Sequence, residues 1–293
     1  AEHLGMCFGV RDAIEMALEQ SATEPLTVLG DLVHNETVLA ELRDRDIKIA
    51  QSVATVDTQT VMVTAHGASD AAMGRVRARG LKVMEATCPL VHVAHRAVAR
   101  LVREGYHPVI VGKREHVEVR GLTEDLGEFG VVLSEADVLA LSERARFGVA
   151  AQTTQPIEKV RGLVDLLRRR FPNSEVRFVD TVCRPTKQRQ NSAIELAQQA
   201  EVVVVIGGAQ SNNTQELVRT CSRYCRRVHH VQGLDDLRED WFDGVQTVGI
   251  TAGTSTPDAS INQVEQWLNE LACRRNHDRG VYATVELHHK QAA

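Results

Sequence analysis

The sequence predicts an α/β protein made of three similar small domains, each with a parallel sheet covered by helices. Short apolar runs rich in valine and isoleucine alternate along the chain with amphipathic helical patterns, which is typical of parallel sheets. The order strand, cysteine, helix also occurs three times, at Cys88, at Cys183 and in shortened form at Cys7. A repeat of this length corresponds to a small domain rather than to a solenoid turn.

The spacing between each cysteine and the polar loop that follows it supports the repeat. This loop lies 27, 28 and 28 residues after the three cysteines, at His34, His116 and Ser211. We therefore expect α/β domains at 8–88, 89–180 and 181–275, with residues 276–293 as a C-terminal tail.

The individual elements follow from the period of the apolar residues, which is two in strands and about 3.6 in helices. The expected strands are 27–30, 47–50, 61–64, 81–85, 107–112, 131–133, 147–151, 176–183, 202–208, 228–231 and 247–251. The expected helices are 11–20, 36–46, 70–80, 91–105, 134–143, 156–171, 184–200, 215–225, 233–240 and 259–272.

The third domain has no closing strand that leads to a cysteine of its own. We expect the N-terminal strand 1–7 to close it by pairing back, which would place the three cysteines around one pseudo-threefold axis. Ligands of parallel α/β sheets bind at the carboxyl ends of the strands, where all six polar loops are expected. The sequence thus predicts one central cavity lined by the motifs VHN, AHG, HVE, QTT, QSNNT and GTST.

Composition excludes several classes of protein. The chain has 293 residues, 43% of them apolar and 25% charged, as in ordinary globular proteins. A net charge of -5 offers no basic face for nucleic acid. No apolar run is long enough for a membrane helix, and no signal peptide is recognisable. We expect a cytoplasmic protein whose six scattered cysteines are reduced.

The cysteines admit three interpretations. A single one would be taken for a buried apolar thiol, but three at matching joints favour a shared ligand role. Zinc is weakly supported, because structural zinc sites draw ligands from close pairs such as C-x-x-C, which this sequence lacks. An iron–sulfur cluster accepts widely spaced thiolates, and a four-iron cluster held by three of them leaves one iron open to substrate. Cys221, Cys225 and Cys273 are interpreted as ordinary helix thiols.

Histidines occur in three of the cavity loops, at His34, His66 and His116. An imidazole there can bind an anion, bind a metal or transfer a proton. Short polar side chains in other loops, and the amides of the helices that these loops begin, favour phosphate oxygens. The expected ligand is therefore a phosphate or diphosphate, and the further donors are Ser211, Asn212, Asn213, Thr254 and Ser255.

Glu118 lies two residues beyond His116, and in an extended segment the two side chains face the same way. It is either a solvated carboxylate or, in a dry cavity, a proton donor, and we favour the donor. Thr153 and Thr154 either pass a proton or cap the following helix, and the sequence leaves both open.

Nine motifs, taken in order, resemble those of the 4-hydroxy-3-methylbut-2-enyl diphosphate reductase family. The match covers nearly all of residues 4–270. Its motifs are GMCFGV, LVHN, TAHG, ATCPLV, HVEV, AQTT, C-x-x-T-x-x-R-Q, SNN and TAGTSTPD. The resemblance implies a three-domain trefoil around an oxygen-sensitive [4Fe-4S] cluster. It also implies the last step of the methylerythritol phosphate route to isoprenoids, in which isopentenyl and dimethylallyl diphosphates are formed.

Carried over by position, the resemblance assigns roles to the motif residues. Glu118 would be the proton donor, assisted by Thr153, with His116 near the diphosphate and the substrate hydroxyl. Ferredoxin or flavodoxin would supply the electrons. The implied cluster ligands are Cys7, Cys88 and Cys183, and the implied diphosphate binders are His34, His66, Ser211, Asn213 and Ser255.

The chain departs from the family pattern at three places. Met6 and Phe8 flank the first cysteine where Gly-Phe-Cys-Ala-Gly is common, which affects packing over the cluster. Pro185 stands where alanine is usual, and we expect the fold to tolerate it at a helix start. Asn212 replaces a serine, and because its amide still donates we expect a modest effect on diphosphate binding.

Two rival functions are a cluster-bearing sensor that holds a phosphorylated metabolite without turnover, and a zinc-stabilised phosphate binder. Glu118 with Thr153 favours the enzyme, because a sensor does not require a proton donor. The tail lies outside the resemblance; its VYATVEL run fits an edge strand or a loose end equally well, and His288 and His289 are not convincing metal ligands.

Overall fold

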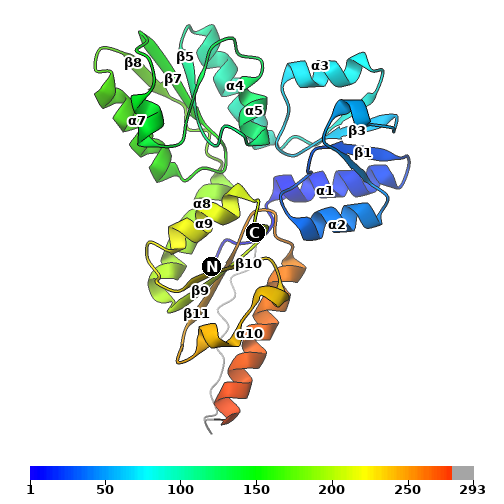
Figure 1. The fold of residues 1–293 in the computed structure, drawn as a ribbon, viewed down its shortest axis with the longest axis vertical. Helices are drawn as coiled ribbons and strands as arrows, with labels where there is room; N and C mark the ends of the chain where they lie inside the picture. The colour runs from blue at the N-terminus through cyan, green and yellow to red at the C-terminus, as the bar shows by residue number, and fades with distance from the viewer. Residues whose placement is uncertain (279–293) are drawn as a thin grey trace. The chain divides into compact units, whose positions relative to one another are not determined.

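A computed structural model describes residues 1–278, which contain three parallel sheets with helices on their faces (Figure 1). The strand orders are β2-β1-β3-β4, β6-β5-β7-β8 and β10-β9-β11, and neighbouring strands in these sheets are parallel. The predicted α/β class with three small parallel sheets is confirmed. No helix in the described part of the chain is long and apolar enough to cross a membrane.

The chain divides into two compact units. The two-sheet unit comprises residues 8–33 and 37–186, and the one-sheet unit comprises residues 1–7, 34–36 and the chain from Lys187 onward. The predicted boundaries of three separate domains stay a prediction.

The first sheet follows a helix that begins directly after Cys7. Buried side chains of its strands and of α3, among them Val61 and Val76, form an apolar cluster on one face. The elements are α1 (Phe8–Ser21), β1 (Leu26–Leu29), α2 (Glu36–Asp44), β2 (Lys48–Ala50), η1 (Val53–Thr55), β3 (Thr60–Val63), α3 (Asp70–Ala78) and β4 (Lys82–Glu85).

The second sheet is covered on both faces, as parallel sheets require. Val109 and Val111 of β5 pack against α6 and α7, while Ile110 between them packs against α4 and α5. This alternation follows from the two-residue period of a strand. The elements are α4 (Pro89–Arg103), β5 (His107–Val111), α5 (Val117–Thr123), β6 (Gly130–Val132), α6 (Glu135–Leu139), β7 (Arg146–Ala151), α7 (Ile157–Arg170) and β8 (Glu175–Phe178).

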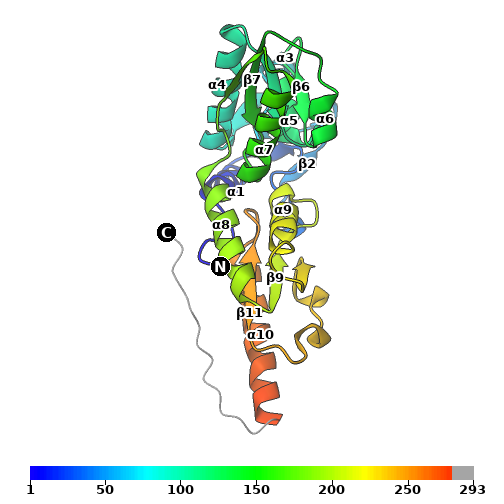
Figure 2. The same ribbon diagram turned by 90° about the vertical axis from the view of Figure 1, so that its left-hand side faces the viewer.

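The third sheet also alternates. Val203 and Val205 of β9 face α8 and α9, whereas Val204 faces α10, which extends beyond the strands in Figure 2. The elements are α8 (Arg184–Gln199), β9 (Val202–Ile206), α9 (Asn212–Cys221), β10 (Val228–Val231), η2 (Leu234–Asp236), η3 (Glu239–Phe242), β11 (Val248–Ala252) and α10 (Asp258–Asp278).

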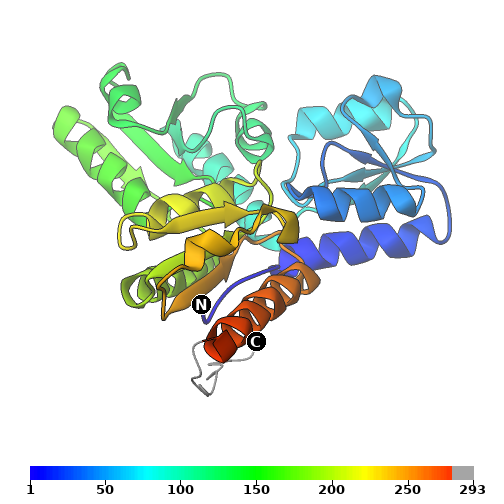
Figure 3. The same cartoon turned by 60° about the horizontal axis from the view of Figure 1, so that its bottom comes forward.

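Residues 1–7 run beside β11, but they do not form the strand that the sequence predicts. The N-terminal ammonium donates to the carbonyl of Ile250 at 2.7 Å, and the Gly5 amide donates to that of Ala252 at 3.3 Å. Figure 3 draws this N-terminal segment in blue. Gly5 has a φ of 74°, in the left-handed region, and this breaks the extended conformation. The segment therefore occupies the edge of the sheet as an irregular chain.

Several predicted elements have other bounds. The segment 113–119, expected to be a loop, contains the start of α5, and α9 begins at Asn212 rather than at 215 because Ser211 caps it. The expected helix 233–240 is replaced by two short 3₁₀ helices, η2 and η3. The possible strand of the tail and the two histidines within it lie outside the described residues.

The core of the second sheet yields a stability prediction. Phe147 is fully buried, with its ring 5.3 Å from that of Phe171, so Phe147→Ala leaves a cavity between sheet and helix. We expect the free energy of unfolding in denaturant titrations to fall by about 3–5 kcal/mol. Leu139→Ala, at a side chain that is 52% exposed, is the control and should cost less than about 1 kcal/mol. Equal losses in the two variants would contradict this account of the core.

Candidate active site

Polar side chains follow two neighbouring strands of every sheet. These neighbouring strands are β1 and β3, β5 and β7, and β9 and β11. Their carboxyl ends lie at one edge of each sheet, where ligands of parallel sheets bind. The polar residues that follow the six strands are, in order, His34, His66, His116, Thr153, Ser211 and Ser255.

The three repeated cysteines make equivalent backbone hydrogen bonds. Each cysteine amide donates to the carbonyl of the residue two positions past the end of β11, β3 or β7. The bonds are Cys7 to Thr254 (3.1 Å), Cys88 to Ala65 (3.1 Å) and Cys183 to Thr153 (3.0 Å). The predicted equivalence of the three joints is therefore visible in the backbone, and each cysteine is tied to a polar loop.

The repeated cysteines also differ from the others in exposure. Cys7, Cys88 and Cys183 are half-buried and form no disulfide within the described residues. Cys221 is fully buried, and its burial raises the pKa of its thiol to about 11, as expected of an ordinary core thiol. Cys225 is also buried but lies beyond the end of α9, contrary to the prediction that the two share a helix. Exposed Cys273 lies on α10.

A glycine adjoins the Cys88 thiol. A Cβ placed on Gly9 would lie 2.4 Å from Cys88 Sγ, so no larger residue fits there without displacing the thiol. The Thr186 hydroxyl similarly lies 3.1 Å from Cys183 Sγ. Pro185, next to it, stands in the first turn of α8, a position where proline is tolerated.

Glu118 is buried and held by one residue of the neighbouring strand end. Its Oε1 accepts the Thr153 amide at 2.6 Å, and its Oε2 accepts the Thr153 hydroxyl at 3.1 Å. Glu118 lies in the first turn of α5, not in the extended segment assumed from the sequence. Neither Thr153 nor Thr154 caps the next helix, whose N-cap is Pro156.

Burial raises the pKa of Glu118 to about 7, and the two hydrogen bonds from Thr153 only partly oppose that shift. A carboxyl group with this pKa is populated in both protonation states near neutral pH. It can therefore give up a proton and regain one under working conditions.

His116 is the N-cap of α5, and its Nδ1 accepts the Glu118 amide at 3.2 Å. In the neutral ring the proton is then on Nε2. His66 lies beside it, with ring centroids 5.4 Å apart in an edge arrangement. The structure thus brings together two of the three predicted histidines within the two-sheet unit.

The loop after His66 is tightly packed. Gly67 has a φ of 77°, and a Cβ there would lie 3.1 Å from side-chain atoms of Thr87 and Val91 and 3.3 Å from His95 Nε2. A larger residue would meet both the strained backbone and these neighbours. Burial lowers the pKa of His95, which favours its neutral form beneath the loop.

In the one-sheet unit, α9 begins with the predicted donors. Ser211 Oγ accepts the Thr214 amide at 3.3 Å as the N-cap. Asn213 Oδ1 accepts the Thr254 amide at 3.0 Å, while its Nδ2 is buried without a partner among the described residues. A buried amide group without a partner costs free energy unless a ligand accepts from it. Asn212 is buried in the same first turn.

Two further contacts of this unit hold the chain segments 34–36 and 1–7. Ser255 Oγ donates to the His34 carbonyl at 3.4 Å, and a Cβ on Gly208 would lie 2.3 Å from that oxygen. Arg189, which is 7% exposed, donates to the Gly5 carbonyl from Nε at 3.0 Å and from Nη2 at 2.6 Å. It therefore fixes the chain just before Cys7.

Sequence reasoning included Thr186 and Arg189 in the C-x-x-T-x-x-R-Q motif without giving them a role, and it missed the Ser69, Glu124 and Asp125 cluster described below. Ser69 carried a signal, since a serine before an acidic residue and a helical run predicts an N-cap. Glu124 and Asp125 carried none, because their partners are 49 to 55 positions away in the chain.

The raised pKa of Glu118 predicts a pH-dependent stability. The folded state holds this proton more tightly than the unfolded state, so the stabilisation is complete below about pH 4.5 and is lost as the pH rises to about 7. Glu118→Gln cannot ionise and so does not lose stability in this way. Between about pH 4.5 and about pH 7, its free energy of unfolding should rise by up to about 3 kcal/mol relative to that of the parent. Exposed Glu115→Gln is the control, and parallel pH curves for parent and Glu118→Gln would refute the buried acid.

Comparison with known proteins agrees with this geometry. Residues 1–269 match the family model described as LytB protein. A protein from Syntrophotalea carbinolica named 4-hydroxy-3-methylbut-2-enyl diphosphate reductase is 34% identical over 275 residues, which cover 93% of this chain and 98% of the relative.

Two solved structures are also similar. One is the E-1-hydroxy-2-methyl-but-2-enyl-4-diphosphate reductase from Plasmodium falciparum, with TM-score 0.84, 25% identity, and 91% and 85% of the two chains covered. The other is (E)-4-hydroxy-3-methyl-but-2-enyl diphosphate reductase, the terminal enzyme of the non-mevalonate pathway, with TM-score 0.66, 34% identity, and 92% and 98% covered. The chain belongs to the LytB protein family.

Proposed function

We propose that this protein is a 4-hydroxy-3-methylbut-2-enyl diphosphate reductase, which catalyses the terminal step of the non-mevalonate pathway to isoprenoids. The observation that carries the proposal is the repeated cysteine joint combined with a buried acid. Thr153 accepts the Cys183 amide through its carbonyl and holds Glu118 through its own amide and hydroxyl. One residue thus connects a thiol ligand to a proton donor.

The reaction removes the hydroxyl group of an allylic diphosphate. Two electrons and two protons enter, water leaves, and isopentenyl or dimethylallyl diphosphate is formed. We infer that ferredoxin or flavodoxin delivers the electrons.

The cysteines fit an iron–sulfur cluster better than zinc. They are half-buried cysteines at equivalent joints, each fixed by its amide, and none belongs to a close C-x-x-C pair. Cys7, Cys88 and Cys183 would hold a [4Fe-4S] cluster, which when bound supplies electrons and one iron without a protein ligand.

The polar residues bind the diphosphate. His116 presents Nε2–H because its Nδ1 is engaged by the helix, and His66 lies beside it. Asn213 Nδ2 supplies a buried donor, and the first-turn amides of α9 favour an anion. We assign substrate binding to His34, His66, His116, Thr153, Ser211, Asn212, Asn213 and Ser255.

Glu118 supplies a proton to the substrate. Its pKa of about 7 keeps a protonated fraction at neutral pH, and the Thr153 hydroxyl in contact with Oε2 orients it. Burial also excludes water, which would otherwise solvate the carboxylate and return the pKa of the group toward its ordinary value.

The cluster is tested by iron and acid-labile sulfide analysis after anaerobic reconstitution. We expect about four of each per chain in the parent and a loss of most of both in Cys7→Ser, Cys88→Ser and Cys183→Ser. Exposed Cys273→Ser is the matched control and should retain its iron. Stoichiometric zinc without sulfide would support the phosphate-binder alternative instead.

The proton donor is tested by turnover of the hydroxylated allylic diphosphate. Glu118→Gln should lower kcat by about 10²- to 10⁴-fold with little change in KM, because the amide cannot give up a proton at neutral pH. Glu115→Gln, on the exposed side of the same loop, should retain parental kcat. A parent protein that binds the diphosphate without turnover would favour the sensor function.

A further inference from the structure

Two segments of the two-sheet unit that carry site histidines lie along one another. Helix α5 begins at His116, bears Glu118 in its first turn and is only 7 residues long. The segment 66–71 contains His66 and leads into α3. The two segments come from different sheets, and the contacts between them extend from the histidines to the far end of α5.

The contact next to the histidines is made by backbone. A Cβ on Gly121 of α5 would lie 3.6 Å from the Ala68 Cα and 3.7 Å from the Gly67 carbonyl oxygen, which is ordinary van der Waals distance. The His66 and His116 rings meet one turn earlier, 5.4 Å apart.

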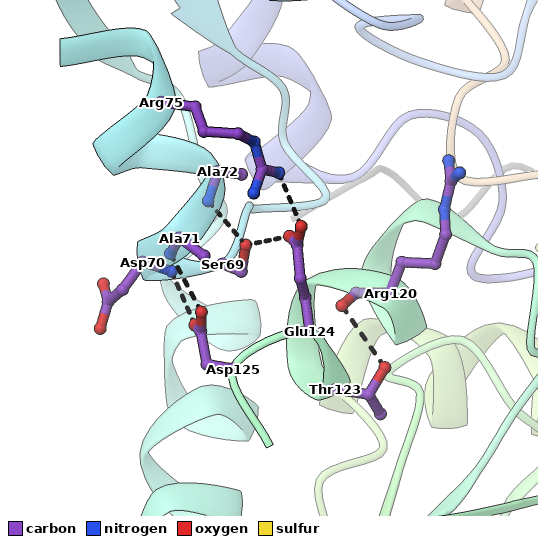
Figure 4. A network of polar contacts seen from close by, with 9 residues as sticks. All are labelled: Ser69, Asp70, Ala71, Ala72, Arg75, Arg120, Thr123, Glu124 and Asp125. Carbon is purple, nitrogen blue, oxygen red and sulfur yellow. Dashed lines mark hydrogen bonds and ion pairs between the residues drawn. The ribbon is translucent and has the colours of Figure 1, made fainter. Parts of the chain in front are cut away.

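Directional contacts occur beyond the end of α5 (Figure 4). The Ser69 hydroxyl donates to the Glu124 carboxylate, and Arg75 Nη2 lies 2.6 Å from Glu124 Oε1. Asp125 accepts the amides of Asp70 at 2.7 Å and Ala71 at 3.0 Å. Residues 116, 121, 124 and 125 thus contact the other segment in the order 66, 67–68, 69 and 70–71.

These contacts complete the start of α3. The first four amides of a helix, counted from the N-cap, have no partner within the helix. Of these, Asp125 accepts the amides of Asp70 and Ala71, and Ser69 Oγ accepts the Ala72 amide at 2.9 Å. A carboxylate at this end is also favoured by the helix dipole. The helix start after His66 therefore depends on Asp125 of the other sheet.

We propose that Glu124 and Asp125 are positioning residues that hold the segment 66–71 along α5 and so keep His66 beside His116 for diphosphate binding. The inference rests on the proposed function for the identity of the anion. Of the residues in these two contacting segments, His66 and His116 would meet the diphosphate, whereas the two carboxylates act through Ser69 and the start of α3.

The test compares cluster-loaded Glu124→Ala/Asp125→Ala with the parent. We expect amide hydrogen exchange in the peptide 64–72 to accelerate at least tenfold. The Kd for inorganic diphosphate, measured by calorimetry, should rise at least fivefold. KM for the allylic diphosphate should rise similarly with kcat within twofold, because Glu118 stays fixed by Thr153.

Two controls separate positioning from loss of charge or of stability. Asp70→Ala removes a carboxylate at the same helix start, but its side chain points away from Asp125 in Figure 4 and leaves both anchors intact. Phe147→Leu destabilises the distant core of the second sheet. Both should retain the exchange rate of peptide 64–72 and the parental Kd for diphosphate.

Unchanged exchange in the double variant, or faster exchange with an unchanged Kd, would overturn the positioning role. A parent that binds diphosphate but does not reduce the allylic substrate would overturn the proposed function while the Kd comparison still judges the inference. A parent that does not bind diphosphate would overturn both.

Discussion

The bond from each cysteine amide to the carbonyl two positions past a strand end is the constraint on which the site depends. It joins a helix start to a polar loop, so the position of each thiol is fixed relative to the polar residues of that loop. A backbone bond of this kind contributes about 1 kcal/mol net, but leaving its buried amide unpaired costs about 1–3 kcal/mol. That asymmetry explains why the same joint is kept in three sheets whose side chains differ.

The third joint uses an irregular segment in place of a strand. Residues 1–7 must satisfy β11, bring Cys7 to Thr254 and then turn into α1. The left-handed Gly5 permits that path, and the buried guanidinium of Arg189 donates to the Gly5 carbonyl oxygen from two nitrogens. A buried charge is tolerated where it is hydrogen-bonded, and here it takes over part of the role that ladder bonds have in the other two sheets.

Alternation of apolar strands with amphipathic helices was sufficient to predict three parallel sheets and polar loops at their ends. The nearly constant spacing between each repeated cysteine and the polar loop after it also predicted joints that proved equivalent in the backbone. What the sequence could not indicate depends on partners far apart in the chain. Asp125 caps a helix that begins 55 residues earlier, and nothing local to it signals this. The start of α5 was missed for a related reason, because histidine is not among the residues that usually mark an N-cap.

That unexpected helix changes the meaning of the His116 and Glu118 pair. In an extended segment they would share a face and compete for one ligand, whereas at a helix start the His116 ring accepts the Glu118 amide and the carboxylate turns to Thr153. In the neutral imidazole the donor is thereby Nε2. The carboxyl group is shielded from water, so that burial outweighs two hydrogen bonds and leaves its pKa near neutrality. One short helix thus places the proposed anion-binding group and the proposed proton donor two residues apart in different surroundings.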